Sequence, residues 1–343
     1  MSANRTICLA NDLDRQHAQF DPLALARLRN DPRRIVIVGA RGWIGRTLLT
    51  LLRNALGADA FSRRVNCFGS SEGEIVLDDG TRQMQAALDD LHKLPPAPTL
   101  LFHLAFLTKD KVAGMDAAAY CAANRALSQT VLDALDVIGV DRLFVASSGA
   151  AAFADDPGAA ADLRLYGTLK REDEARFAEW AQRHRDCRRV AIGRIYAVSG
   201  PWMNKHETYA LASFILDALA ARPIEVNAAH RVMRSYVAVR ELLSLVMAIL
   251  LGPDGQAVER FATGGEVLEL GQVADTVAKV IGGTVVRKAI TSPEENRYIG
   301  DAVGWQALLA RHDMVHLPLA AQVAETAVWL ARQAGGTRTF QTG

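Results

Sequence analysis

Two residues, Tyr166 and Lys170, have the types and the spacing for proton transfer. Positions i and i+4 of a helix lie on one face, so a helix here would make the phenol and the ammonium neighbours. A tyrosine phenol has a pKa of about 10, and a nearby ammonium favours its ionised form. Such a tyrosine can exchange a proton with a substrate oxygen while a nicotinamide exchanges a hydride with the attached carbon. Because Tyr-x-x-x-Lys also arises by chance, the assignment depends on the surrounding elements.

A glycine-rich turn is the second feature with chemical meaning. It follows the apolar run 35–38 and precedes the helix-forming stretch 46–56. Between a strand and a helix, such glycines let a pyrophosphate lie on the helix N-terminus, where free N–H groups and the dipole favour anions. The spacing is GxxGxxG, and we favour cofactor binding over a tight structural turn. The turn residues expected at the cofactor are Gly39, Arg41, Gly42, Trp43, Ile44 and Gly45.

The type of cofactor is suggested by the end of the second apolar run, 65–68. A carboxylate there would hold the ribose 2′-hydroxyl of NAD. Here Ser70 and Ser71 follow the run, and Glu72 is the first acid. Together with Arg41, the two serines can hold a 2′-phosphate through charge-assisted hydrogen bonds. The sequence therefore slightly favours NADP(H) over NAD(H).

Continuous apolar runs alternate with stretches of helical spacing over the first 200 residues. This alternation predicts an α/β fold with a doubly wound parallel sheet, because right-handed crossovers place helices on both faces. We expect an N-terminal extension (1–32), a cofactor-binding domain (33–195) and a smaller, mostly helical substrate-binding domain (196–343), some of whose segments return to the sheet. The apolar runs are 35–38, 65–68, 99–104, 143–146 and 190–195.

Composition excludes several classes of protein. The 343 residues carry 39 Lys+Arg against 38 Asp+Glu, a formal charge of +1, which disfavours a nucleic-acid or membrane-surface partner. The four cysteines form no CxxC pair, so neither a zinc site nor a disulfide framework is expected. The longest apolar run, 242–251, is too short to span a bilayer, which needs about 20 residues. With no secretory signal visible, we expect a cytoplasmic protein that binds a small molecule and no metal.

The order of these motifs resembles the extended short-chain dehydrogenase/reductase family, which contains nucleotide-sugar epimerases, dehydratases and reductases. The resemblance covers about residues 34–331. It rests on the glycine turn and on a strand ending in Ser147-Ser148 before Tyr166 and Lys170. Further matches are Phe102-His103-Leu104-Ala105, Asn124, the segment 193–201 and the segment 234–242.

The resemblance implies a Rossmann-like fold and roles for particular residues. Tyr166 would be the proton donor or acceptor, and Lys170 would lower its pKa and hold the nicotinamide ribose. Leu104 and Ala105 would line the cofactor. Ser148, with Ser147 as second choice, would orient the substrate oxygen. In the substrate domain, Arg234 would hold the substrate diphosphate, and Asn204 would contact sugar or phosphate.

One departure from the family pattern bears on the reaction. Where the 4,6-dehydratases carry an Asp-Glu pair for water elimination, this sequence has Ala150-Ala151, so dehydration is disfavoured. We therefore expect an NAD(P)-dependent nucleotide-sugar epimerase or keto-sugar reductase that transfers hydride at a ring carbon, most plausibly C4, in sugar-nucleotide or surface-polysaccharide biosynthesis. The resemblance also suggests a homodimer packed through 117–138 and 165–184. The alternative is a non-catalytic NAD(P)-binding sensor or interaction protein of the same fold.

Overall fold

The computed structural model describes residues 18–108, 115–206, 208–253 and 255–333. The chain forms two compact units, each described here by itself. The N-terminal unit comprises Asp21–Ile195 and Leu243–Ala262, and the C-terminal unit comprises mainly Tyr196–Leu242 and the described residues from Thr263 on. Cys8 and the other residues before 18 lie outside the described part.

A large sheet forms the centre of the N-terminal unit. Its described strands follow the order β11-β7-β6-β5-β1-β2-β4-β3, and all neighbours pair in parallel except β3, which runs antiparallel to β4. This arrangement confirms the expected α/β fold with a doubly wound, Rossmann-like sheet. The strands are β1 (Arg34–Val38), β2 (Val65–Gly69), β3 (Gly73–Val76), β4 (Arg82–Ala87), β5 (Thr99–His103), β6 (Val140–Ser148), β7 (Arg189–Ile195) and β11 (Val258–Ala262).

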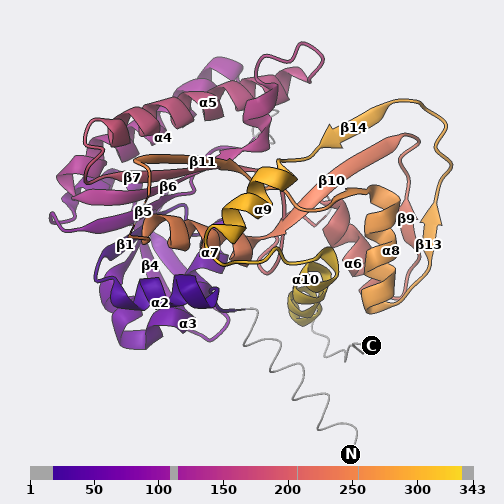
Figure 1. Cartoon of the computed structure of the whole chain (residues 1–343), viewed down its shortest axis with the longest axis horizontal. Coiled ribbons are helices and arrows are strands. Elements are labelled where there is room, and N and C mark those ends of the chain that lie inside the picture. Colours follow the sequence, from indigo (N-terminus) through magenta and orange to yellow (C-terminus); the bar gives the residue numbers. More distant parts are fainter. Residues whose placement is uncertain (1–17, 109–114, 207, 254, 334–343) are drawn as a thin grey trace, which may run out of the picture. The chain divides into compact units, whose positions relative to one another are not determined.

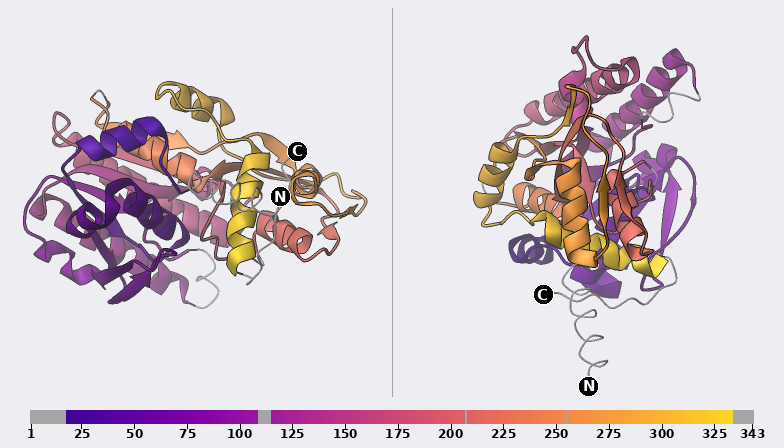
Figure 2. Two further views of the ribbon diagram at one scale, coloured as in Figure 1. Left: turned by 90° about the horizontal axis from the view of Figure 1, so that it is seen from below. Right: turned by 90° about the vertical axis from the view of Figure 1, so that its right-hand side faces the viewer.

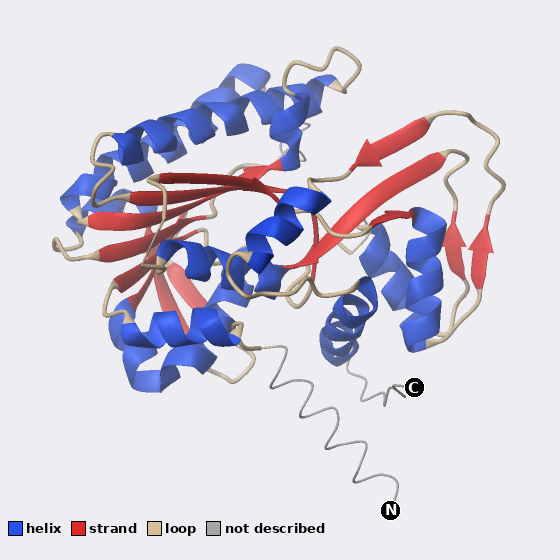
Figure 3. Cartoon of the chain, viewed as in Figure 1, coloured by secondary structure: helices blue, strands red, loops and turns tan. Residues whose placement is uncertain are grey.

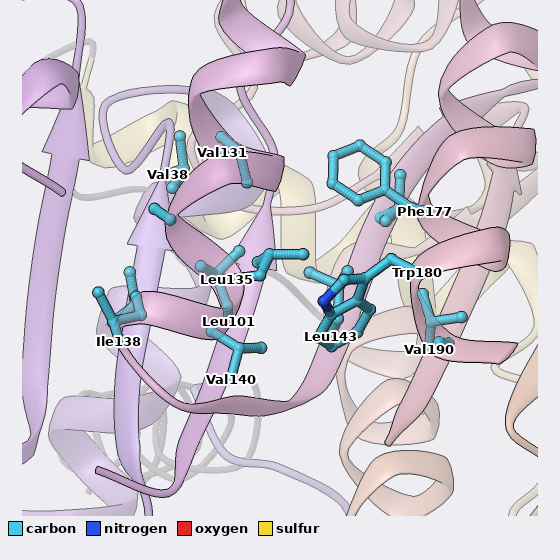
Figure 4. Close-up of a cluster of buried hydrophobic side chains, with 14 of the residues drawn as sticks. Val38, Leu101, Val131, Leu135, Ile138, Val140, Leu143, Phe177, Trp180 and Val190 are labelled. Atoms are coloured by element: carbon cyan, nitrogen blue, oxygen red, sulfur yellow. The ribbon is translucent and has the colours of Figure 1, made fainter. Parts of the chain in front are cut away.

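Helices cover both faces of this sheet (Figures 1 and 3). On one face lie α4 (Ala117–Val137) and α5 (Ala161–Gln182), and on the other lies α3 (Trp43–Arg64). Burial on both faces explains why the central strands are continuous apolar runs. Figure 4 shows the core under α4 and α5, where Leu135 and Phe177 meet strand residues such as Leu101.

The N-terminal unit reaches back beyond residue 33, where the sequence places the start of the first domain. Helix α2 (Pro22–Asn30) buries Ala24 and Leu28. The backbone N–H of Asp21 donates to Ser244 Oγ at 2.9 Å, and Arg27 donates to the carbonyl of Ala248. Both acceptors lie in α7 (Val239–Leu250), which leads to the returning strand β11.

The C-terminal unit combines helices with small sheets. Strands β8 (Ala197–Ser199), β12 (Val267–Glu269) and β14 (Glu295–Tyr298) all pair with β10 (Arg231–Ala238), and β9 (Ile224–Val226) pairs with β13 (Val285–Arg287). Its helices are α6 (Ala210–Leu219), α8 (Leu270–Ile281), α9 (Ala302–Ala310) and α10 (Leu319–Gln333). Helices α6, α8 and α10 pack together around one apolar core (Figure 2).

Candidate active site

The glycine turn joins β1 to α3 at the carboxyl end of the sheet. Gly39 has φ +95°, and a Cβ there would lie 2.7 Å from the backbone nitrogen of Ala105. Only glycine therefore lets the turn approach the end of β5 this closely. Gly42 is the N-cap of α3, whose first turn carries Trp43, Ile44 and Gly45. The turn has the backbone form that a pyrophosphate needs at a helix N-terminus.

Arg41 reaches from this turn to the end of β2. Its Nη1 donates to Ser71 Oγ at 3.0 Å, and its Nη2 donates to the carbonyl of Glu72 at 3.2 Å. Gln85 of β4 supports the same loop, because its Nε2 donates to the carbonyl of Ser71 at 2.8 Å. The structure thus brings Arg41 and Ser71 together at the end of β2, with Ser70 as the preceding residue.

Tyr166 and Lys170 lie on α5, as their spacing predicts. The next residue, Gly167, explains how this face approaches the sheet: a Cβ there would lie 2.2 Å from the carbonyl oxygen of Ala150. Glycine thus allows α5 to pack on η3 (Gly149–Phe153), the 3-10 turn that follows β6. This packing places the first half of α5 against η3, which directly follows the two serines at the end of β6.

Lys170 is buried, with only 5% of its surface exposed. Its Nζ donates to the carbonyl of Ala146 at 2.8 Å and lies 3.7 Å from the centroid of the Phe106 ring. Burial lowers the pKa of Lys170 to about 8, while the carboxylates of Asp173 and Glu174 act in the opposite direction. Near neutral pH the ammonium is therefore charged and close to its titration point.

The two serines at the end of β6 have different partners. Ser148 Oγ accepts a hydrogen bond from the backbone N–H of Ala150 at 3.2 Å. Ser147 instead donates to Oε1 of Glu174 at 2.5 Å. Arg194 of β7 binds the same carboxylate through Nε at 2.9 Å and Nη2 at 2.8 Å.

The segment after β5 holds Leu104 and Ala105 against the glycine turn. The backbone N–H of Leu104 donates to the carbonyl of Val38 at 2.9 Å. Asn124 of α4 accepts from the N–H of Leu107 at 2.9 Å, so this buried amide fixes the segment. His103 is 2% exposed, and burial, together with the charge of Lys170, lowers its pKa to about 3. It is a neutral packing residue whose ring lies 5.1 Å from that of Phe177.

The two expected substrate ligands of the later sequence, Arg234 and Asn204, lie in the C-terminal unit. Arg234 is on β10, and its Nη1 donates to Asn296 Oδ1 at 2.9 Å and to the carbonyl of Met233 at 2.8 Å. Burial lowers its pKa from the usual arginine value. Asn204 is exposed in the loop after β8.

Three residues of the N-terminal site were missed by the sequence analysis: Phe106, Glu174 and Gln85. Glu174 lies four residues after Lys170, so the helical spacing that pairs Tyr166 with Lys170 could have pointed to it. Phe106 directly follows Leu104 and Ala105, whose expected place at the cofactor could have pointed to it. Gln85 has no such signal, because it reaches the site from β4, which is distant in sequence.

These residues fit a dinucleotide. The glycine turn forms a cradle that a Cβ at Gly39 would fill, and Arg41 and the buried Lys170 supply cations on either side. No group of three or more metal-ligating side chains occurs among the described residues. Within the same residues, no helix is long and apolar enough to cross a membrane.

Solved structures share this fold. A structure of MoeE5 with UDP-glucose and NAD has a TM-score of 0.64 at 20% identity, and one of UDP-glucose 4-epimerase from Thermotoga maritima with UDP-glucose has 0.62 at 15%. Each alignment covers 88% of this chain and 99% of the other. The search of curated proteins found no match.

A family model assigns the chain more specifically. The model of the NAD dependent epimerase/dehydratase family matches residues 35–264, which is more than half of the chain and includes the glycine turn, Tyr166 and Lys170. The resemblance to the extended short-chain dehydrogenase/reductases is thereby confirmed, and the chain belongs to the NAD dependent epimerase/dehydratase family.

Proposed function

We propose that the protein is an NAD(P)-dependent enzyme that epimerises a nucleotide sugar, or reduces a keto sugar, at a ring carbon, with C4 the first candidate. The observation that carries the proposal is the proximity of Tyr166, the charged Lys170 and the end of β6 in one unit with the glycine turn. The solved relatives are described as complexes with UDP-sugars and NAD or as UDP-sugar 4-epimerases, which supports this substrate class.

Each of the site residues would have a defined role in the reaction at the sugar hydroxyl. Ser148 orients the oxygen, and Tyr166 removes its proton or returns it. The Lys170 ammonium favours the phenolate, because an opposite charge stabilises the ionised form. A bound nicotinamide supplies the hydride acceptor and donor. Arg234 binds the substrate diphosphate, and Asn204 contacts sugar or phosphate.

We also propose a preference for NADP(H) over NAD(H). The position of Arg41 over Ser71, in a loop where Glu72 contributes its carbonyl, supports binding of a 2′-phosphate. Arginine presents planar donors that suit phosphate oxygens. Leu104 and Ala105, which lie against the turn, would line the nicotinamide half.

Dehydration is disfavoured by the residues that follow Ser148. Ala150 and Ala151 are buried on η3 and supply no acid or base for water elimination. Epimerisation or reduction needs only the tyrosine and the hydride carrier. We place the reaction in sugar-nucleotide or surface-polysaccharide biosynthesis.

A homodimer formed through α4 and α5 is part of the same proposal. Three small side chains on α4, those of Ala118, Ala122 and Ala126, are exposed at a helical spacing that allows close approach of another helix. Light scattering on the wild type and on Ala122→Arg tests it. A monomeric wild type would contradict it.

The function is tested by assaying the purified protein with a panel of UDP-sugars and their 4-keto derivatives, with NADPH or NADH, and following products by NMR. An epimer formed without net cofactor turnover identifies an epimerase, and stoichiometric oxidation of the cofactor identifies a reductase. Cofactor binding without turnover of any nucleotide sugar would favour the alternative, a non-catalytic NAD(P)-binding sensor.

A further inference from the structure

The ring of Phe106 covers the catalytic pair of the proposed enzyme. Its centroid lies 3.7 Å from Nζ of Lys170 and 5.6 Å from the centroid of Tyr166, at an interplanar angle of 71°. An ammonium over the face of an aromatic ring is attracted by the ring quadrupole, most strongly where water is excluded. Phe106 therefore stabilises Lys170 in this position.

The backbone that carries Phe106 is fixed on both sides. Before it, Leu104 is hydrogen-bonded to Val38. After it, Leu107 is bonded through its N–H to Asn124 at 2.9 Å and through its carbonyl to the hydroxyl of Tyr120 at 2.6 Å. The side chain itself is only half-buried. The ring can therefore change rotamer while its Cα stays in place.

Lys170 has only 5% of its surface exposed while the ring is in this position. Its ammonium is bonded to Ala146, and the Phe106 ring lies against it. A ribose hydroxyl would have to approach Nζ to about 2.9 Å, a distance that the ring blocks. The titratable groups around Nζ are Tyr166, whose ring centroid lies 6.0 Å away, His103 from β5, and Asp173 and Glu174 from α5. Arg194 of β7 is already bound to Glu174.

We propose that Phe106 is a gating residue for the cofactor: its ring competes with the nicotinamide-side ribose for the ammonium of Lys170 and rotates away when the ribose binds. The inference rests on the proposed function, in which Lys170 holds that ribose. Because the cation–π contact is lost on binding, the ring lowers the affinity of the wild type for the cofactor.

The test compares the dissociation constants of NADPH and NADH, measured by fluorescence titration, for the wild type, Phe106→Leu and Phe106→Tyr. Leucine keeps apolar bulk without an aromatic face, so affinity rises by about 3- to 30-fold, the range expected for one cation–π contact. Tyrosine keeps the face, so its affinity stays near that of the wild type. Unchanged affinity in Phe106→Leu would overturn the gate.

A second background separates the charge effect from simple steric relief. In Lys170→Met no ammonium remains for the ring to hold, so adding Phe106→Leu leaves the dissociation constant within about twofold. Equal tightening in both backgrounds would refute the competition for Lys170. If neither the wild type nor Phe106→Leu binds NADPH or NADH, both the gate and the proposed function are refuted. If the two proteins bind the cofactor with the same affinity, only the gate is refuted.

Discussion

The hydroxyl of Ser147 donates a 2.5 Å hydrogen bond to the carboxylate of Glu174, which Arg194 also binds. Its neighbour Ser148 accepts from the N–H of Ala150 at the start of η3. Adjacent residues of a strand point to opposite faces, which separates the two hydroxyls. This difference supports the proposal that Ser148 is the hydroxyl that orients the substrate.

The two serines should therefore respond differently to alanine substitution. Ser148→Ala is expected to lower kcat by about 10²- to 10³-fold, through loss of one oriented hydrogen bond, and to cost only about 0.5–1 kcal/mol of stability, through loss of its cap on η3. Ser147→Ala should destabilise the fold by about 1–3 kcal/mol, because a buried carboxylate loses a donor. Steady-state kinetics and urea denaturation measure the two effects. The reverse pattern would assign the substrate role to Ser147.

Replacing Tyr166 by phenylalanine removes only the hydroxyl. Turnover should fall by at least about 10²- to 10⁴-fold, the contribution of a general acid or base. Cofactor affinity should be nearly unchanged, because the ring and its contact with Phe106 remain. Kinetics and a cofactor titration on one preparation test both parts. A near-normal rate would refute the assignment.

The lowered pKa of Lys170 predicts a pH dependence of stability. Burial lowers its folded-state pKa to about 8, from the ordinary lysine value of 10.5. Between these values the unfolded chain binds more protons, so the free energy of unfolding should rise with pH by up to about 1.4 kcal/mol per unit. Below pH 8 both states are protonated, and this dependence vanishes.

Lys170→Met provides the reference for that measurement, because the other titrating groups are shared. Urea denaturation from pH 7 to 10 gives the difference between the two proteins. The wild type should gain stability relative to the variant above pH 8. A flat difference over this range would mean that Lys170 titrates near its ordinary value.

Arg41→Ala tests the proposed cofactor preference. Loss of a charge-assisted contact to a 2′-phosphate should weaken NADPH binding by about 10- to 100-fold and leave NADH binding nearly unchanged. Ser71→Ala, which removes the hydroxyl that Arg41 contacts at 3.0 Å, should have a smaller effect in the same direction. Equal losses for both cofactors would contradict a 2′-phosphate site.

Glu241 is a buried carboxylate of the C-terminal unit. It accepts from Trp305 Nε1 at 2.8 Å and from the N–H of Leu317 at 2.6 Å, and it contacts His316 Nδ1 at 2.9 Å. Glu241→Ala should destabilise the protein by about 3 kcal/mol or more, since buried donors lose their acceptor. Thermal unfolding measures this loss. A shift in melting temperature below about 1 °C would show that these donors find other partners.

The sequence by itself determined the features that depend on local spacing. Central strands such as β1 and β5 were predicted from their apolar runs, because strands buried on both faces need apolar side chains throughout. The glycine turn followed from Gly39, Gly42 and Gly45, and the Tyr166–Lys170 pair from one turn of helix. In each case the informative residues are near one another in the chain.

Only the tertiary structure decided the features made by residues distant in sequence. Strand β4, which lies between β2 and the edge strand β3, is polar, RQMQAA, and gives no apolar run, yet it brings the Gln85 amide within hydrogen-bond distance of the Ser71 carbonyl. Strand β11 returns to β7 after an excursion into the other unit, a pairing that no local pattern encodes. Phe106 meets Lys170 because hydrogen bonds to Val38 and Asn124 fix the backbone around it. Such contacts depend on which strands are neighbours, so the sequence supplied the reacting groups and the fold decided what surrounds them.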